Sequence, residues 1–98
     1  MTAPVTFVNI IEVEPEKQQE AIEILKEGTE KVISQQPGFV SLELLASADG
    51  KRVLNVARWE SVDALKAVQT NPEAGEYVKQ LLAVATATPG PYQVVATY

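Results

Sequence analysis

Four segments of the chain show the period-two pattern and the β-branched and aromatic content of strands that bury at least one face. The first segment is 5–13, and the second and third, 39–47 and 52–59, flank the turn sequence Ala48-Asp49-Gly50-Lys51. The fourth is 92–98. These patterns predict four strands, with a hairpin between the second and the third. In the second strand the alternation separates two sets of residues, which are Val40, Leu42, Leu44 and Ala46 on one face and Phe39, Ser41, Glu43 and Leu45 on the other.

The first long interval between these strands has the spacing of an amphipathic helix. Over 16–35, Ile22, Leu25 and Val32 recur at helical intervals, while Glu and Lys occupy the outer positions. Pro15 precedes the segment and suits the first turn of a helix, where its missing N–H has no intrahelical partner. Pro37-Gly38 is a stop signal. One helix is therefore predicted over 16–35.

The second long interval is predicted to hold two helices. Ser61 is a suitable N-cap for a short helix around 62–70. Asn71-Pro72 breaks this helix, and a second one is expected over roughly 73–86. Thr88-Pro89-Gly90-Pro91 is predicted to be a loop before the last strand.

The predicted order is β-α-β-β-α-β, the ferredoxin-like α+β arrangement, in one domain spanning 1–98. Two helices cover only one face of such a sheet, yet the first and third strands are apolar on both faces. An uncovered apolar face usually marks an interface, so we predict a homodimer packed sheet to sheet. The opposed pairs are Val8 and Ile10 against Phe7 and Ile11, and Leu54 and Val56 against Val53 and Ala57.

Composition restricts the chemistry. The 98 residues include no histidine and no cysteine, so a metal site would need carboxylate or tyrosine ligands alone, and His-based nucleophilic schemes are excluded. The five glycines form neither a P-loop nor a dinucleotide motif. We therefore expect no bound metal. The net charge of −5 argues against nucleic acid, no apolar run reaches membrane-spanning length, and the lack of cysteine fits a cytoplasmic location.

The most informative motif is Asn55-Val56-Ala57-Arg58-Trp59-Glu60-Ser61, at the end of the third predicted strand. Because side chains alternate, Asn55, Ala57 and Trp59 share one face with Val53. An amide then lies beside the only tryptophan of the chain on an apolar surface. This arrangement predicts a pocket in which a flat organic molecule binds, although an indole at such a position is also typical of a core.

The chain resembles the antibiotic biosynthesis monooxygenase family of dimeric α/β-barrel proteins over nearly its whole length. The most specific shared feature is the N-x-x-x-W-E-S motif that begins at Asn55. The others are Val-Asn-Ile-Ile-Glu-Val at 8–13, Pro37-Gly38-Phe39, Asn71-Pro72 and Gly90-Pro91. The resemblance implies a ferredoxin-like domain that dimerises into a β-barrel.

Some members of this family modify polyketides. The resemblance to these members implies cofactor-free oxidation of phenolic or anthrone-type aromatics by O2. The amide and the indole that act there correspond to Asn55 and Trp59, but Leu65 stands where those members have a tyrosine. In haem-degrading members, an amide and a tryptophan correspond to Asn9 and Trp59. The histidine that ligates haem has no counterpart in this chain, which argues against haem oxygenation.

We predict Asn55 and Trp59 as the catalytic residues, because an amide in a dry pocket can stabilise developing oxyanion charge. Four further residues are candidates for binding the substrate: Asn9, Phe39, Tyr77 and Tyr92.

Two other classes of function stay open. A non-catalytic dimer that binds a small apolar aromatic metabolite, as in a stress response, is favoured by the lack of a clear general base. An isomerase or decarboxylase that stabilises an enolate in the same pocket would work without oxygen. The leading prediction is a cofactor-independent monooxygenase that acts on a phenolic, quinol or anthrone-like aromatic.

Overall fold

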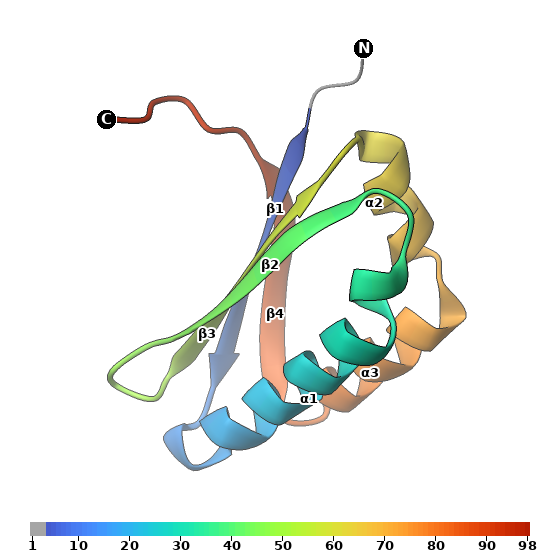
Figure 1. The fold of residues 1–98 in the computed structure, drawn as a ribbon. Helices are drawn as coiled ribbons and strands as arrows, with labels where there is room; N and C mark the ends of the chain where they lie inside the picture. The colour runs from blue at the N-terminus through green and yellow to red at the C-terminus, as the bar shows by residue number, and fades with distance from the viewer. Residues whose placement is uncertain (1–3) are drawn as a thin grey trace.

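The computed structural model describes residues 4–98 and confirms the predicted ferredoxin-like α+β architecture. A four-stranded antiparallel sheet has the strand order β2-β3-β1-β4, and the helices cover one of its faces (Figure 1). No helix within the described residues is long and apolar enough to cross a membrane. The elements are β1 (Val5–Val13), α1 (Gln18–Lys31), β2 (Phe39–Ala46), β3 (Arg52–Trp59), α2 (Val62–Gln69), α3 (Pro72–Leu82) and β4 (Ala85–Tyr92), with short 3-10 helices at Pro15–Lys17 and Ile33–Gln35.

The two central strands have the bounds that the alternation predicts and pair in a regular antiparallel register. Ile11 lies opposite Val53, and both side chains are fully buried beneath the helices. Asn9, two residues before Ile11, lies opposite Asn55, two residues after Val53, and both are on the same face of the sheet as Ile11 and Val53. The period-two pattern of β1 and β3 therefore places two amides in the layer where the core would otherwise be apolar.

β2 departs from the predicted alternation because it contains a bulge. Phe39 pairs with Trp59, whereas Ser41 pairs with Arg58, so Val40 is an additional residue in the strand. Val40 is consequently exposed, and Phe39 lies on the same face as Leu42. The predicted placement of Phe39 and Leu42 on opposite faces is wrong for this reason.

The first helix is shorter than the predicted 16–35. It opens with the 3-10 turn Pro15–Lys17 and continues as α1 to Lys31, beyond which Ile33–Gln35 forms another 3-10 turn. Gly38 ends this region with a φ of 85°. A Cβ at Gly38 would lie 2.5 Å from the Cβ of Ala64, so both conformation and packing require glycine there.

The start of each later helix is fixed by a side-chain cap. Ser61 Oγ accepts a hydrogen bond from the Ala64 N–H at 3.2 Å, which confirms Ser61 as the N-cap of α2. Asn71 Oδ1 accepts hydrogen bonds from the N–H groups of Glu73 and Ala74 at 2.8 and 3.2 Å, and Pro72 fills the first turn of α3. α3 ends at Leu82, four residues before the predicted end.

The last strand corrects the prediction. β4 spans Ala85–Tyr92 and includes the Pro89-Gly90-Pro91 sequence that was predicted to be a loop, while 93–98 form no strand. Prolines fit because β4 is an edge strand, where a residue that cannot donate a backbone hydrogen bond is tolerated. Pairing with β1 puts Pro89 opposite Asn9 and Pro91 opposite Phe7.

Candidate functional site

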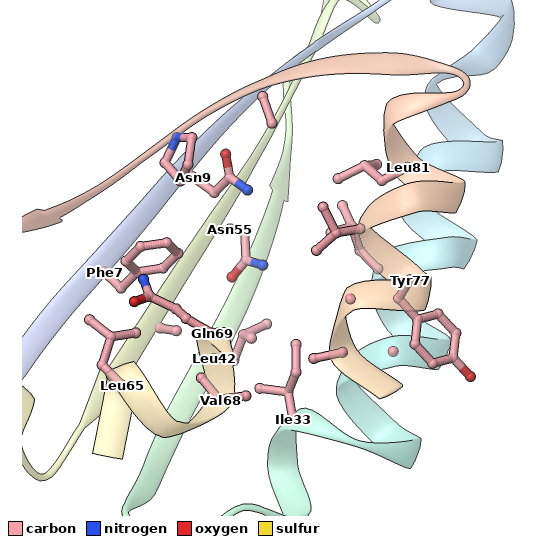
Figure 2. Close-up of a pocket in the computed structure, with 18 of the residues that line it drawn as sticks. Phe7, Asn9, Ile33, Leu42, Asn55, Leu65, Val68, Gln69, Tyr77 and Leu81 are labelled. Atoms are coloured by element: carbon pink, nitrogen blue, oxygen red, sulfur yellow. The ribbon is translucent and has the colours of Figure 1, made fainter. Parts of the chain in front are cut away.

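A cavity of about 460 Å³ lies between the sheet and the three helices. This volume falls in the usual range for sites that bind small molecules. All four strands and α1, α2 and α3 contribute to the lining, which is mostly aliphatic and aromatic (Figure 2). Of residues 4–98, none that lines the cavity carries a formal charge. The polar side chains of the lining are those of Asn9, Asn55, Trp59, Gln69 and Tyr77.

Asn9 and Asn55 form a pair of amides on the sheet side of the cavity. They are directly opposite in the β1–β3 register, and Figure 2 shows both amide groups projecting from the sheet toward α3. Asn55 is only 8% exposed. The Oδ1 atoms of both residues are buried and have no hydrogen-bond partner among residues 4–98. We call these two residues the amide pair.

An unsatisfied buried oxygen is unusual, because nearly all buried polar atoms in proteins find a partner. Leaving one such group unpaired costs about 1–3 kcal/mol, and the amide pair contains two of them. Core packing gives no reason to retain this cost. A ligand hydroxyl that donates a hydrogen bond to these oxygens would remove this cost, and the amide N–H groups can donate to an oxygen of the same molecule. The amide pair is therefore suited to hold the polar edge of a bound molecule.

Trp59 provides an aromatic wall of the cavity. Its side chain is 1% exposed and belongs to the larger hydrophobic cluster, so the indole is both a core residue and part of the lining. Phe39 packs behind it, with ring centroids 5.5 Å apart and an interplanar angle of 84°. Phe39 does not line the cavity. The prediction of Phe39 as a residue that contacts the substrate is therefore corrected: it supports the indole edge to face.

The two predicted tyrosines have different positions. Tyr77 of α3 lines the cavity, but its ring packs on Gly28 of α1 and its hydroxyl points away from the amide pair (Figure 2). Tyr92 is outside the lining and half-exposed at the end of β4. Its partner in the register is Thr6, which belongs to the uncovered face of the sheet. The prediction that Tyr92 lines the cavity is wrong, because β4 begins seven residues earlier than the alternation indicated.

Sequence reasoning missed several lining residues. Gln69 reaches from the end of α2 toward Phe7 (Figure 2), and no sequence signal distinguishes it from an ordinary exposed glutamine. Pro89 and Pro91 join the lining through their register with β1, which could be found only once β4 was placed. Leu65 is buried and lines the cavity, so the cavity wall is apolar at this position. It is the position compared above with a tyrosine of the polyketide-modifying members.

Fold and site together define a small α+β domain with an apolar cavity and a polar pair on its sheet side. Residues 4–80 match the antibiotic biosynthesis monooxygenase family, and the chain belongs to this family.

Particular relatives resemble this chain in sequence, in fold or in both. The chain is 42% identical over 67 residues to tetracenomycin-F1 monooxygenase of Streptomyces glaucescens, and the match covers 68% of this chain and 60% of that protein. SnoaB of Streptomyces nogalater, described as a cofactor-independent oxygenase, is 26% identical with a TM-score of 0.80 over 98% of this chain and 97% of its own. A conserved protein of Bacteroides thetaiotaomicron, at 16% identity and a TM-score of 0.84 over 94% of this chain and 98% of its own, shares the fold alone.

Proposed function

We propose that this protein is a cofactor-independent monooxygenase that oxidises a phenolic, quinol or anthrone-like aromatic with O2. The observation that carries the proposal is the amide pair, whose buried oxygens lack partners within an otherwise apolar cavity. The similarity to tetracenomycin-F1 monooxygenase and to SnoaB, a cofactor-independent oxygenase, supports the same activity.

An anthrone illustrates the proposed reaction. Loss of a proton gives an electron-rich anion, which passes one electron to triplet O2 and then combines with the resulting superoxide to form a hydroperoxide. Elimination of water from the protonated hydroperoxide leaves a new carbonyl group. One O2 is consumed, one of its oxygen atoms enters the product, and the other leaves as water with the two hydrogens of the substrate carbon.

The chain contributes binding, orientation and electrostatic stabilisation to this scheme. The amide N–H groups of Asn9 and Asn55 would donate to the substrate oxygen on which negative charge develops, and this would lower the pKa of the bound substrate. Trp59 would hold the flat ring system against the sheet. The uncharged lining excludes water and strengthens each of these hydrogen bonds.

The proposal is tested by O2 uptake. Purified protein, treated with chelator and free of flavin, is expected to consume O2 with at least one member of a panel of anthrones, quinols and naphthols faster than autoxidation. Product formed under ¹⁸O2 is expected to contain one labelled oxygen atom. Denatured protein is the control. The absence of uptake above autoxidation across the panel would contradict the proposal.

A binding protein without catalytic activity is the second candidate. The uncharged lining favours it, because the described residues that line the cavity include no carboxylate base and the chain has no histidine. Saturable quenching of Trp59 fluorescence by a panel compound, without O2 uptake, would support this function. Turnover of a compound under nitrogen would instead indicate the isomerase or decarboxylase class.

We also propose that the uncovered face of the sheet forms a homodimer interface. Four aliphatic residues lie on that face at the centre of the sheet, and each keeps intermediate exposure in the single chain; they are Val8, Ile10, Leu54 and Val56. Arg58 and Glu43, whose charged groups are 3.9 Å apart, lie beside them. An apolar centre next to charged residues is typical of protein interfaces. A cytoplasmic location stays a prediction from composition.

Val56→Glu is expected to weaken this dimer by about 100-fold or more, because the carboxylate would be buried without a partner at the centre of the interface. Sedimentation equilibrium measures the change. Val62→Glu is the matched control, since Val62 is an exposed valine on α2, on the opposite side of the sheet. A wild-type protein that stays monomeric at tens of micromolar, or equal weakening by both substitutions, would contradict the proposed interface.

A further inference from the structure

The residues that line the cavity differ in exposure according to their element. Those contributed by β1, β3 and α1 are buried or half-buried. The exposed ones come from the end of α2, from α3 and from β4. A cavity meets solvent where its lining is exposed, so this cavity opens between α3 and β4. The exposed lining residues are Gln69, Gly75, Val78, Leu82, Pro89 and Pro91.

Gly75 is distinctive among these residues because nothing in the fold requires a glycine there. A Cβ at Gly75 would meet no atom of the described residues 4–98 within 4 Å, and the φ of Gly75 is not positive. Gly28 differs, because a Cβ there would come within 2.9 Å of Tyr77 Cγ. Glycine weakens a helix relative to alanine. A glycine in α3 that neither packing nor backbone conformation explains, at the mouth of a cavity, indicates that open space is needed at that position.

We propose that the ligand reaches the cavity between α3 and β4 and that Gly75 sets the width of this opening. Val78 and Leu82 follow Gly75 at helical spacing and are half-exposed, so the α3 rim presents apolar side chains to solvent. Pro89 and Pro91 form the β4 rim. An apolar rim with a gap at Gly75 suits a neutral, flat polycyclic molecule, whereas a phosphorylated or carboxylated one would meet no cationic side chain among the described residues that line the cavity.

This opening is compatible with the proposed dimer, because the helices and the uncovered face lie on opposite sides of the sheet (Figure 1). The proposed access route between α3 and β4 rests on the proposed function in one respect, which is that the cavity is the ligand site. Access to the cavity can be measured without turnover, since Trp59 lines it and is the only tryptophan in the chain.

The test places one removable group at the opening. The chain contains no cysteine, so Gly75→Cys introduces a unique thiol, which benzyl methanethiosulfonate converts to a bulky mixed disulfide. Glu76→Cys is the matched control, because Glu76 is exposed on α3 outside the cavity lining. Two rates are measured before and after labelling, both under nitrogen: quenching of Trp59 by acrylamide, and association of 1,8-dihydroxyanthrone.

Labelling at position 75 is expected to slow acrylamide quenching severalfold and dihydroxyanthrone association by about tenfold, because a blocked opening must first rearrange. Dithiothreitol is expected to restore both rates, which shows that the protein has not unfolded. Labelling at position 76 is expected to change neither. Unchanged acrylamide quenching after labelling at 75, or equal slowing at 76, would overturn the proposal. Acrylamide quenching requires neither turnover nor ligand affinity, so a negative O2 assay would leave this result intact.

Gly75→Ala supplies a second measurement. A methyl group fits at this position, so the substitution is expected to raise the Tm by about 4–8 °C through helix propensity. Gly75→Phe is expected to fold as well and to slow acrylamide quenching without labelling. A Gly75→Ala protein with a lowered Tm would show that packing requires this glycine and would overturn the argument for open space.

Discussion

Asn55→Leu is expected to remove most of the proposed oxygenase activity and at the same time to stabilise the protein. Leucine has nearly the shape of asparagine but no polar atom, so the substitution removes one buried, unpaired oxygen. We expect the free energy of unfolding to rise by about 1–3 kcal/mol. Loss of one donor to a developing oxyanion is expected to reduce kcat by about 10²- to 10³-fold. Urea denaturation and O2 uptake with an active panel compound measure the two effects.

Two further variants show whether the donor is what matters. Asn55→Asp keeps the shape but replaces the amide donor with an acceptor, and should therefore also lose activity, with a lower stability because a charge is buried. Asn9→Leu removes the other member of the amide pair, which has the same unsatisfied oxygen but a more exposed side chain, and should have a smaller effect in both measurements. An Asn55→Leu protein that keeps wild-type turnover would exclude a catalytic role for this residue.

Trp59→Ala is expected to be the most destabilising single substitution, at about 3–5 kcal/mol. The indole is the largest fully buried side chain in the described part of the chain, and its removal leaves the ring of Phe39 without the edge-to-face partner. Domains of this size have total stabilities of about 5–15 kcal/mol, so the variant would be near its unfolding threshold at 37 °C. Far-UV circular dichroism in a urea titration measures the loss.

Trp59→Phe is the corresponding control. It preserves an aromatic ring against Phe39 and should lose clearly less stability than Trp59→Ala, while widening the cavity by the volume of the missing ring. Equal stability losses for the two variants would contradict the expectation that aromatic packing on Phe39 stabilises the protein at this position.

The sequence pattern predicted the site best where local and tertiary preferences agree. β1 and β3 are apolar, β-branched and central, so their period-two alternation placed Asn9, Asn55 and Trp59 on the helix-covered face, as the register shows. The caps Ser61 and Asn71 could also be predicted from the sequence, because their side chains accept hydrogen bonds from backbone N–H groups three or fewer residues away.

The errors arose where pairing with a distant strand overrides local signals. Pro89, Gly90 and Pro91 are typical of a loop, yet β1 pairs with all three and makes them part of β4. The resulting shift of the strand moved Tyr92 out of the site. The bulge at Val40 is similarly invisible in the sequence, because one additional residue leaves both flanking patterns intact while changing the face on which Phe39 lies.

The proline-bearing strand β4 has a consequence for how this protein associates. An exposed edge strand ordinarily has unpaired backbone N–H and C=O groups, with which a strand of another chain can pair. Such pairing is a common start of aggregation. Pro89 and Pro91 have no backbone N–H, so a further strand that pairs with this edge would lack two hydrogen-bond donors. The β2 edge carries the bulge at Val40, which interrupts a ladder in another way. With both margins of the sheet unsuited to extension, copies of this chain can stack face against face but are hindered from growing side by side into fibres.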